Sequence, residues 1–137
     1  MQILIELIIG VILAIGFLLL ARRSVNFDQE KRIYAVGLVV AALIYVGFGL
    51  FSAPVAWKII ELLGVPVYAF FAWMGLKKSG WFLVVGWALH VVWDAGLHGA
   101  STPFVPHWYI AGCIGFDLLV GVYIAVREVK NRISATC

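Results

Sequence analysis

Charge is the scarcest property of this 137-residue sequence, in which Asp, Glu, Lys and Arg together make up 12% of the residues. Ordinary globular proteins carry about 25% charged residues. Hydrophobic residues make up 64% of the chain, and a soluble chain of this size buries only about two-thirds of the surface that unfolding exposes. The composition therefore excludes a soluble globular domain and indicates an integral membrane protein.

Cysteine is also scarce, which excludes a small domain held by disulfides. The two cysteines are Cys113, inside an apolar run, and Cys137, at the end of the chain. Two such residues form no disulfide framework, and we interpret them as thiols without a redox role. The net charge of +3 lies in short basic clusters between apolar runs. This distribution fits membrane topology rather than a phosphate-binding face, so no nucleic-acid partner is expected.

Long apolar runs take up most of the chain. A membrane-spanning helix needs about 20 predominantly apolar residues. We predict an all-α, polytopic membrane helix bundle, a single integral membrane domain over residues 1–137. Its five transmembrane helices cover approximately residues 3–20, 33–51, 54–76, 80–98 and 108–126. The first run has no basic segment before it and ends at Arg22 and Arg23, so we interpret it as a helix and not as a signal peptide.

The basic residues predict the orientation of these spans. Nine of the ten would lie on one side of a five-span bundle, namely Arg22, Arg23, Lys31, Arg32, Lys77, Lys78, Arg127, Lys130 and Arg132. The excess of Lys and Arg in cytoplasmic loops makes that side cytoplasmic. The N-terminus is therefore expected outside and the C-terminus in the cytoplasm.

Small residues recur inside every predicted span. In lipid they allow helix backbones to approach closely. Ala111 and Gly115 form one small-xxx-small pair in the last span. This pair predicts either a tight helix crossing or the seam of a homo-oligomer, and membrane lipid is the other expected partner.

Eight ionisable residues remain outside the basic clusters, and helix rise places all of them in the outer half of the bilayer. They are Glu6, Lys58, Glu61, His90, Asp94, His98, His107 and Asp117. Those near the span ends could simply extend to the outer interface. His90, Asp94 and Asp117 are harder to explain in this way, at depths of about 6 Å for Asp94, about 12 Å for His90 and about 15 Å for Asp117. Charged groups within a span usually mark a functional site or a water-filled cavity.

The segment GWALHVVWDAGLHG, residues 86–99, places three of these residues on one helix stripe. His90, Asp94 and His98 are four residues apart, and the two histidines are separated by about 12 Å along the axis. A metal ion is readily shared by residues i and i+4, but not by both ends of an i,i+8 pair. Either two of the three bind one ion while the third orients a ligand, or the stripe serves two ions with Asp94 between them.

Other segments supply further candidate ligands and bases. We predict metal ligands among His90, Asp94, His98 and His107, and catalytic general bases in Asp117 and Glu61. Nitrogen and carboxylate donors suit a divalent metal such as Zn, Mn or Fe. The corresponding function is a metal-dependent hydrolase that activates water against an amphipathic substrate from the outer leaflet.

Two other functions stay open at this point. Carboxylates and histidines at graded depths suit a proton- or cation-coupled transporter or sensor, with Lys58 and Glu61 as a gate. The inner half, however, offers only Tyr34 and Ser79 for such a path, which favours a one-sided pocket. The third reading is a haem- or lipid-binding subunit with His90 as the haem ligand.

The segments LHVVWDAGLHG and VPHWYIAGCIGFDLLVGVYIA resemble an uncharacterised family of small integral membrane proteins of bacteria and fungi. That family is marked by a His-x-x-Trp-Asp core, a nearby His and an Asp in the last span. The matching residues are His90, Trp93, Asp94, His98 and Asp117. The resemblance covers the C-terminal third and implies no activity. We expect the protein to be integral to the bacterial inner (plasma) membrane. In ligand type alone, the set is also similar to membrane hydrolases of the alkaline ceramidase type, whose serine motif this chain lacks.

Overall fold

The apolar runs form helices, in which each backbone group finds its hydrogen-bond partner within the same segment. The computed structural model describes residues 1–99 and 102–136, and this part of the chain contains helices and no strands. The helices are α1 (Gln2–Ala21), α2 (Phe27–Ser52), α3 (Val55–Lys77), α4 (Trp81–Trp93), the π-helix η1 (Asp94–His98) and α5 (His107–Thr136). The predicted all-α class is confirmed.

Four of the helices, α1, α2, α3 and α5, are long and apolar enough to cross a membrane. The helix α4 has 13 residues and continues directly into the five residues of η1. Two helices extend beyond their predicted spans, since α2 begins at Phe27 instead of residue 33 and α5 ends at Thr136 instead of residue 126. At the start of α2, the Asn26 side chain accepts a hydrogen bond from the Gln29 backbone N–H at 3.0 Å. This N-terminal cap lets the helix begin before the predicted span.

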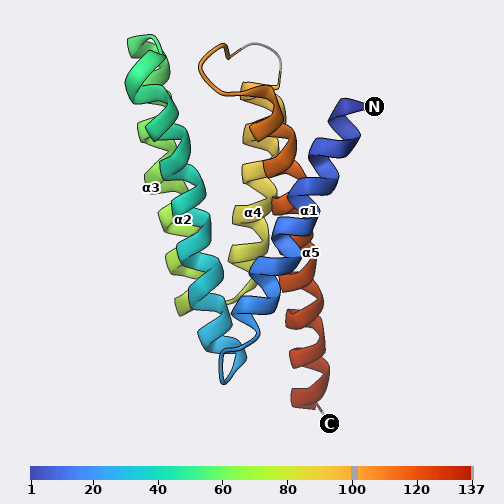
Figure 1. Cartoon of the computed structure of the whole chain (residues 1–137). Coiled ribbons are helices and arrows are strands. Elements are labelled where there is room, and N and C mark those ends of the chain that lie inside the picture. The colour runs from blue at the N-terminus through green and yellow to red at the C-terminus, as the bar shows by residue number, and fades with distance from the viewer. Residues whose placement is uncertain (100–101, 137) are drawn as a thin grey trace.

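The helices run alternately up and down, and the two termini lie at opposite ends of the bundle (Figure 1). The N-terminus shares one end with the α2–α3 turn and the start of α5; we call this the N-terminal end. The C-terminus shares the other end, the C-terminal end, with the α1–α2 and α3–α4 turns. The nine basic residues of the sequence clusters belong to the segments at the C-terminal end.

The closest helix contact joins α1 to α5. A Cβ atom on Gly10 would collide with the backbone carbonyl of Gly112, and one on Gly115 would collide with the carbonyl of Leu7. The pair Ala111 and Gly115 therefore lies at or beside a tight crossing within the chain, one of its two predicted roles. The helix α1 packs along α5 and hardly contacts α2.

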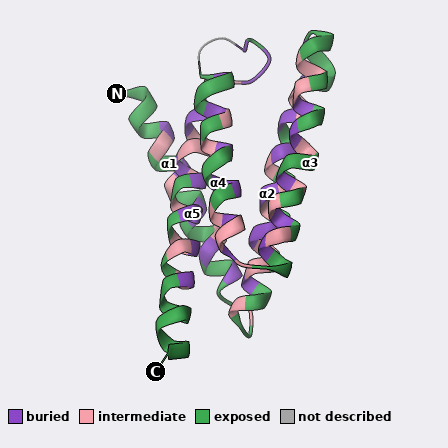
Figure 2. Cartoon of the chain, turned by 180° about the vertical axis from the view of Figure 1, so that it is seen from behind, coloured by how far each residue is buried: buried purple, intermediate pink, exposed green. Residues whose placement is uncertain are grey.

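The buried residues lie where the helices face one another, and exposed residues cover the outside (Figure 2). Leu38, Leu83, Trp87, Val120 and Ile124 form the centre of the main core, each at most 1% exposed. Large apolar side chains also cover the outer faces, for example Ile12 at 60%, Leu62 at 62% and Val122 at 58% exposure. An apolar surface of this extent needs a partner other than water.

Candidate metal centre

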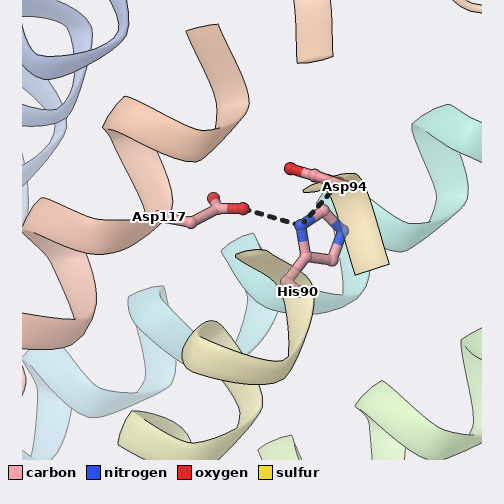
Figure 3. A group of neighbouring side chains, drawn as sticks. All are labelled: His90, Asp94 and Asp117. Carbon is pink, nitrogen blue, oxygen red and sulfur yellow. Dashed lines mark hydrogen bonds and ion pairs between the residues drawn. The ribbon is translucent and has the colours of Figure 1, made fainter. Parts of the chain in front are cut away.

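Three ionisable side chains meet in the interior between α4, η1 and α5 (Figure 3). His90 and Asp94 are fully buried, and Asp117 is 2% exposed. His90 Nδ1 lies 2.7 Å from Asp117 Oδ2 and 3.6 Å from Asp94 Oδ1. One ligand atom from each residue lies within 4.8 Å of the other two. We call these three residues the His90 group.

Several polar atoms in and around this group have no hydrogen-bond partner in the described chain. They are both carboxylate oxygens of Asp94, the Nε2 atom of His90 and the hydroxyl of Tyr45. Tyr45 lies beside Asp94, and its ring centroid is 5.7 Å from that of His90. Burying a polar group without a partner costs several kcal/mol in apolar surroundings. The site therefore offers donor atoms that the protein itself does not satisfy.

A π-turn begins at Asp94, whose backbone N–H still bonds to the His90 carbonyl as in an α-helix. The α-helical hydrogen bonding of α4 ends at Trp93, and the next five residues are wound as the π-helix η1. Single π-turns inside helices are rare and are frequent at functional sites. The regular helix predicted through residue 98 is thus wrong for its last turn. The wider turn leaves Asp94 near His90 while His98 turns to a different partner.

That partner is Glu61 of α3, which lies with His98 in a second buried cluster. His98 Nε2 is 2.9 Å from Glu61 Oε1, and both residues are 2% exposed. The other ring nitrogen, Nδ1, is 3.0 Å from the Thr102 hydroxyl. The ring of Tyr45 stacks on His98 at a centroid distance of 4.5 Å. Tyr45 therefore contacts both the His90 group and this His98–Glu61 pair.

A cavity of about 410 Å³ adjoins His98 at the N-terminal end of the bundle. Its lining also includes Thr102, His107 and Ile110. Its position provides an approach from that end to the His98–Glu61 pair.

The predicted site residues thus fall into two buried clusters and one exposed position. Among the described residues, the only group of three or more side chains that could hold a metal ion is His90, Asp94 and Asp117. Asp117, predicted as a general base, joins this group, whereas His98 and His107 lie outside it. The His107 side chain is 67% exposed, and its Nδ1 atom lies 3.8 Å from Glu6 Oε2. Lys58 forms no ion pair in the described part of the chain, and Glu61 lies instead beside His98.

A further buried carboxylate was missed by the sequence analysis. Glu30 is 3% exposed at the C-terminal end, where residues 21–32 were interpreted as a polar connection. Arg127 pairs with it at 3.1 Å, and the hydroxyls of Tyr34 and Tyr123 donate to it at 3.1 and 3.4 Å. The expectation that this half holds only Tyr34 and Ser79 is therefore wrong. The spacing of Glu30 and Tyr34, one helix turn apart, was the available signal.

The His90 group fits a divalent metal ion in its donor chemistry. One imidazole and two carboxylates form a nitrogen and oxygen set that suits Zn, Mn or Fe. The unpartnered oxygens of Asp94 point to a missing positive charge or donor. A hydrogen bond between His90 and Asp117 is also the usual arrangement by which a carboxylate orients a metal-binding histidine.

Comparison with known proteins gives a family but no activity. The family model described as "Family of unknown function (DUF6010)" matches residues 5–129. This match agrees with the expected resemblance to an uncharacterised family and extends it from the C-terminal third to most of the chain. No curated protein and no solved structure matches the chain.

Proposed function

The chain belongs to the DUF6010 family of unknown function, and we propose that it is an integral membrane protein whose His90 group binds one divalent metal ion for hydrolysis of an amphipathic substrate. The unpartnered, fully buried carboxylate of Asp94 beside the His90–Asp117 pair carries this proposal.

The membrane location is supported by the helices and by the charge distribution. Four helices are long and apolar enough to span, and the 13 residues of α4 with the five of η1 would make a fifth crossing. The basic residues lie at the C-terminal end of the bundle, which would be cytoplasmic by the excess of Lys and Arg on that side. The N-terminus and the His98 cavity then lie toward the outside, in the plasma membrane.

Charge balance supports the metal. Two aspartates and one imidazole leave a net negative charge on the group, whether His90 is neutral or protonated. An isolated aspartate at the centre of a spanning helix costs at least about 2.5–3.5 kcal/mol. A divalent cation would neutralise both carboxylates and supply a partner for Asp94. The site would then be satisfied without any other charged side chain.

The surrounding residues suit a hydrolytic role. When bound, a divalent ion supplies the Lewis acidity that activates water near neutral pH. Asp117 would bind the ion or hold the His90 ring through Nδ1, at 2.7 Å. Glu61 and His98 would accept and pass on the proton, because Glu61 Oε1 lies 2.9 Å from His98 Nε2. Tyr45 would link the two clusters.

Metal analysis of the protein purified in detergent, with zinc present in the buffers until a final desalting step, tests the proposal. We expect about one metal ion per chain, with at least about tenfold weaker binding in Asp94→Asn and in His90→Ala. Glu30→Gln is the matched control, since Glu30 is a buried carboxylate that already has partners. Folded wild-type protein without metal would contradict the proposal, and so would equal loss of metal in Glu30→Gln.

A proton- or cation-coupled transporter or sensor is the second candidate, favoured by the short His90–Asp117 contact and by the Glu30 network at the opposite end. The apolar core of Leu38, Leu83 and Val120 lies in the C-terminal half of the bundle, and a continuous path would have to cross it. Flux into proteoliposomes that is lost in Asp117→Asn would favour this candidate, provided that no metal is bound. The visible spectrum of the same protein tests haem binding.

A further inference from the structure

A groove of about 580 Å³ opens on the side of the bundle, between α1 and α2. It exists because α1 packs along α5 and leaves α2 almost without contact. Its walls are apolar side chains of the two helices, and its floor is formed by Trp87 and by α5 residues that include Phe116 and Asp117. The wall residues include Ile9, Leu13, Phe17, Val40, Ala41 and Ile44. Its volume lies in the range of about 300–1,000 Å³ that is typical of small-molecule sites.

The groove contains a buried carboxylate with an unused oxygen. Glu6 lines it near the N-terminal end and is 8% exposed. Its Oε1 atom accepts a hydrogen bond from Gln2 at 3.0 Å, whereas Oε2 is buried and has no partner. His107 Nδ1 is 3.8 Å from Oε2, which is too far for a hydrogen bond. A ligand that carries an N–H or O–H group could satisfy this oxygen.

Asp117 provides the second polar feature of the groove. It lines the floor and also belongs to the His90 group. The Glu6 backbone lies beside Gly112 of α5, and Asp117 follows Gly112 by five residues, so helix rise places Asp117 about 7.5 Å deeper than Glu6. The groove therefore connects an acceptor near the end of the bundle to the candidate metal centre by a largely apolar path.

The shape and chemistry of the groove select one kind of occupant. Apolar cavities do not retain water well. We infer that the groove binds a single-chain amphiphile that carries an ester or amide bond. Its ammonium or hydroxyl headgroup donates to Glu6, and its chain runs between α1 and α2 and brings that bond toward Asp117. This inference rests on the proposed function and names the substrate class and its route of entry.

Photolabelling of the full chain in phosphatidylcholine nanodiscs tests it. The probe is a long-chain primary amine with a diazirine in the middle of its chain, and peptide mass spectrometry locates the label. We expect labelling of the groove walls on α1 and α2 at least about tenfold above that of the outer face of α3, at Leu62 and Leu63. Equal labelling of the two regions would overturn the inference.

Two variants separate groove binding from general contact with lipid. Ala41→Trp fills the groove and should reduce labelling to the α3 level, whereas Leu43→Trp should leave it unchanged. Leu43 is 48% exposed and does not line the groove. If Ala41→Trp proves unstable, Val40→Trp at a position 46% exposed takes its place. Unchanged labelling in a folded groove-filling variant would overturn the inference.

The headgroup is tested with Glu6→Gln and with a sulfate-headed probe of the same chain. In Glu6→Gln we expect the preference for the amine probe over the sulfate probe to fall by about tenfold, because the variant loses one charge-assisted hydrogen bond to the amine. An unchanged preference would overturn the role of Glu6. Metal content is measured on the same samples. Groove labelling without metal would overturn only the proposed function, and bound metal without groove labelling would overturn only this inference.

Discussion

Two buried charged clusters at different levels of the bundle differ in how their hydrogen bonds are satisfied. At the C-terminal end, Glu30 receives Arg127 and two tyrosine hydroxyls, and the Arg127 guanidinium also lies over the Phe27 ring at 4.8 Å. In the His90 group, Asp94 is equally buried but neither of its oxygens has a hydrogen-bond partner.

The difference separates a structural role from a binding role. Buried charges are normally paired and hydrogen-bonded, and the Glu30 network follows that rule. The His90 group follows it only if a ligand is added. Burial alone therefore does not distinguish the two clusters; the unsatisfied oxygens of Asp94 do, and the proposed metal site rests on them.

The largest expected effect on stability lies in the Glu30 network. Arg127→Met would leave Glu30 buried without its cation, and we expect the free energy of unfolding to fall by about 3 kcal/mol, the lower end for a broken buried pair, because the Arg127 side chain is 26% exposed. Thermal unfolding in detergent measures it. The double variant Glu30→Gln, Arg127→Met is the control and should recover part of the loss. A loss below about 1 kcal/mol would mean that this network is no more important than a surface pair.

The His90 group should respond with the opposite sign. In chelator-treated protein, we expect Asp94→Asn to raise the free energy of unfolding by about 1–2 kcal/mol, because a buried carboxylate that accepts no hydrogen bond loses its charge. With zinc at 100 times its dissociation constant, the wild type should gain about 2.7 kcal/mol and the variant nothing. If Asp94→Asn destabilises the metal-free protein as much as Arg127→Met does, the contrast between the two clusters is wrong.

The smallest effect is expected at an exposed pair on the same helix as Glu30. Lys31 Nζ lies 2.8 Å from Asp28 Oδ1, but the Asp28 side chain is 83% exposed. We expect Asp28→Asn to change the free energy of unfolding by less than about 1 kcal/mol in the same unfolding assay. A change comparable to that of Arg127→Met would show that burial does not determine the effect of a broken pair in this protein.

Hydropathy was sufficient to locate the helices, because a helix is one of the few structures in which a long apolar run can form all its backbone hydrogen bonds. It failed at the polar ends of α2 and α5, where Glu30 was interpreted as part of a connection and Arg127 as part of a polar tail. The sequence did contain a signal for the first of these ends. Asn26 and Gln29 have the spacing of a capping box, and the structure shows Gln29 accepting from the Val25 backbone as Asn26 accepts from Gln29.

The depth of the site within the bundle could be predicted from the sequence, but the full set of residues that form it could not. Helix rise placed Asp117 level with His90, and the two side chains are 2.7 Å apart. The rotation of η1 could not be predicted, because a π-turn depends on tertiary packing and not on a local pattern. His98 was therefore grouped with His90, whereas it pairs with Glu61. The unused oxygens of Asp94 and Glu6 likewise become visible only once the surrounding helices are in place.

The π-turn makes the alignment of the two clusters sensitive to the number of residues in this segment. Winding these residues as a regular α-helix without a deletion would rotate His98 by about 100° about the helix axis and move it along by about 1.5 Å. His98 would then turn away from Glu61, while His90 and Asp117 would stay in place. The extra residue held in η1 thus sets the angular offset between the paired imidazole beside the His98 cavity and the imidazole of the candidate metal centre.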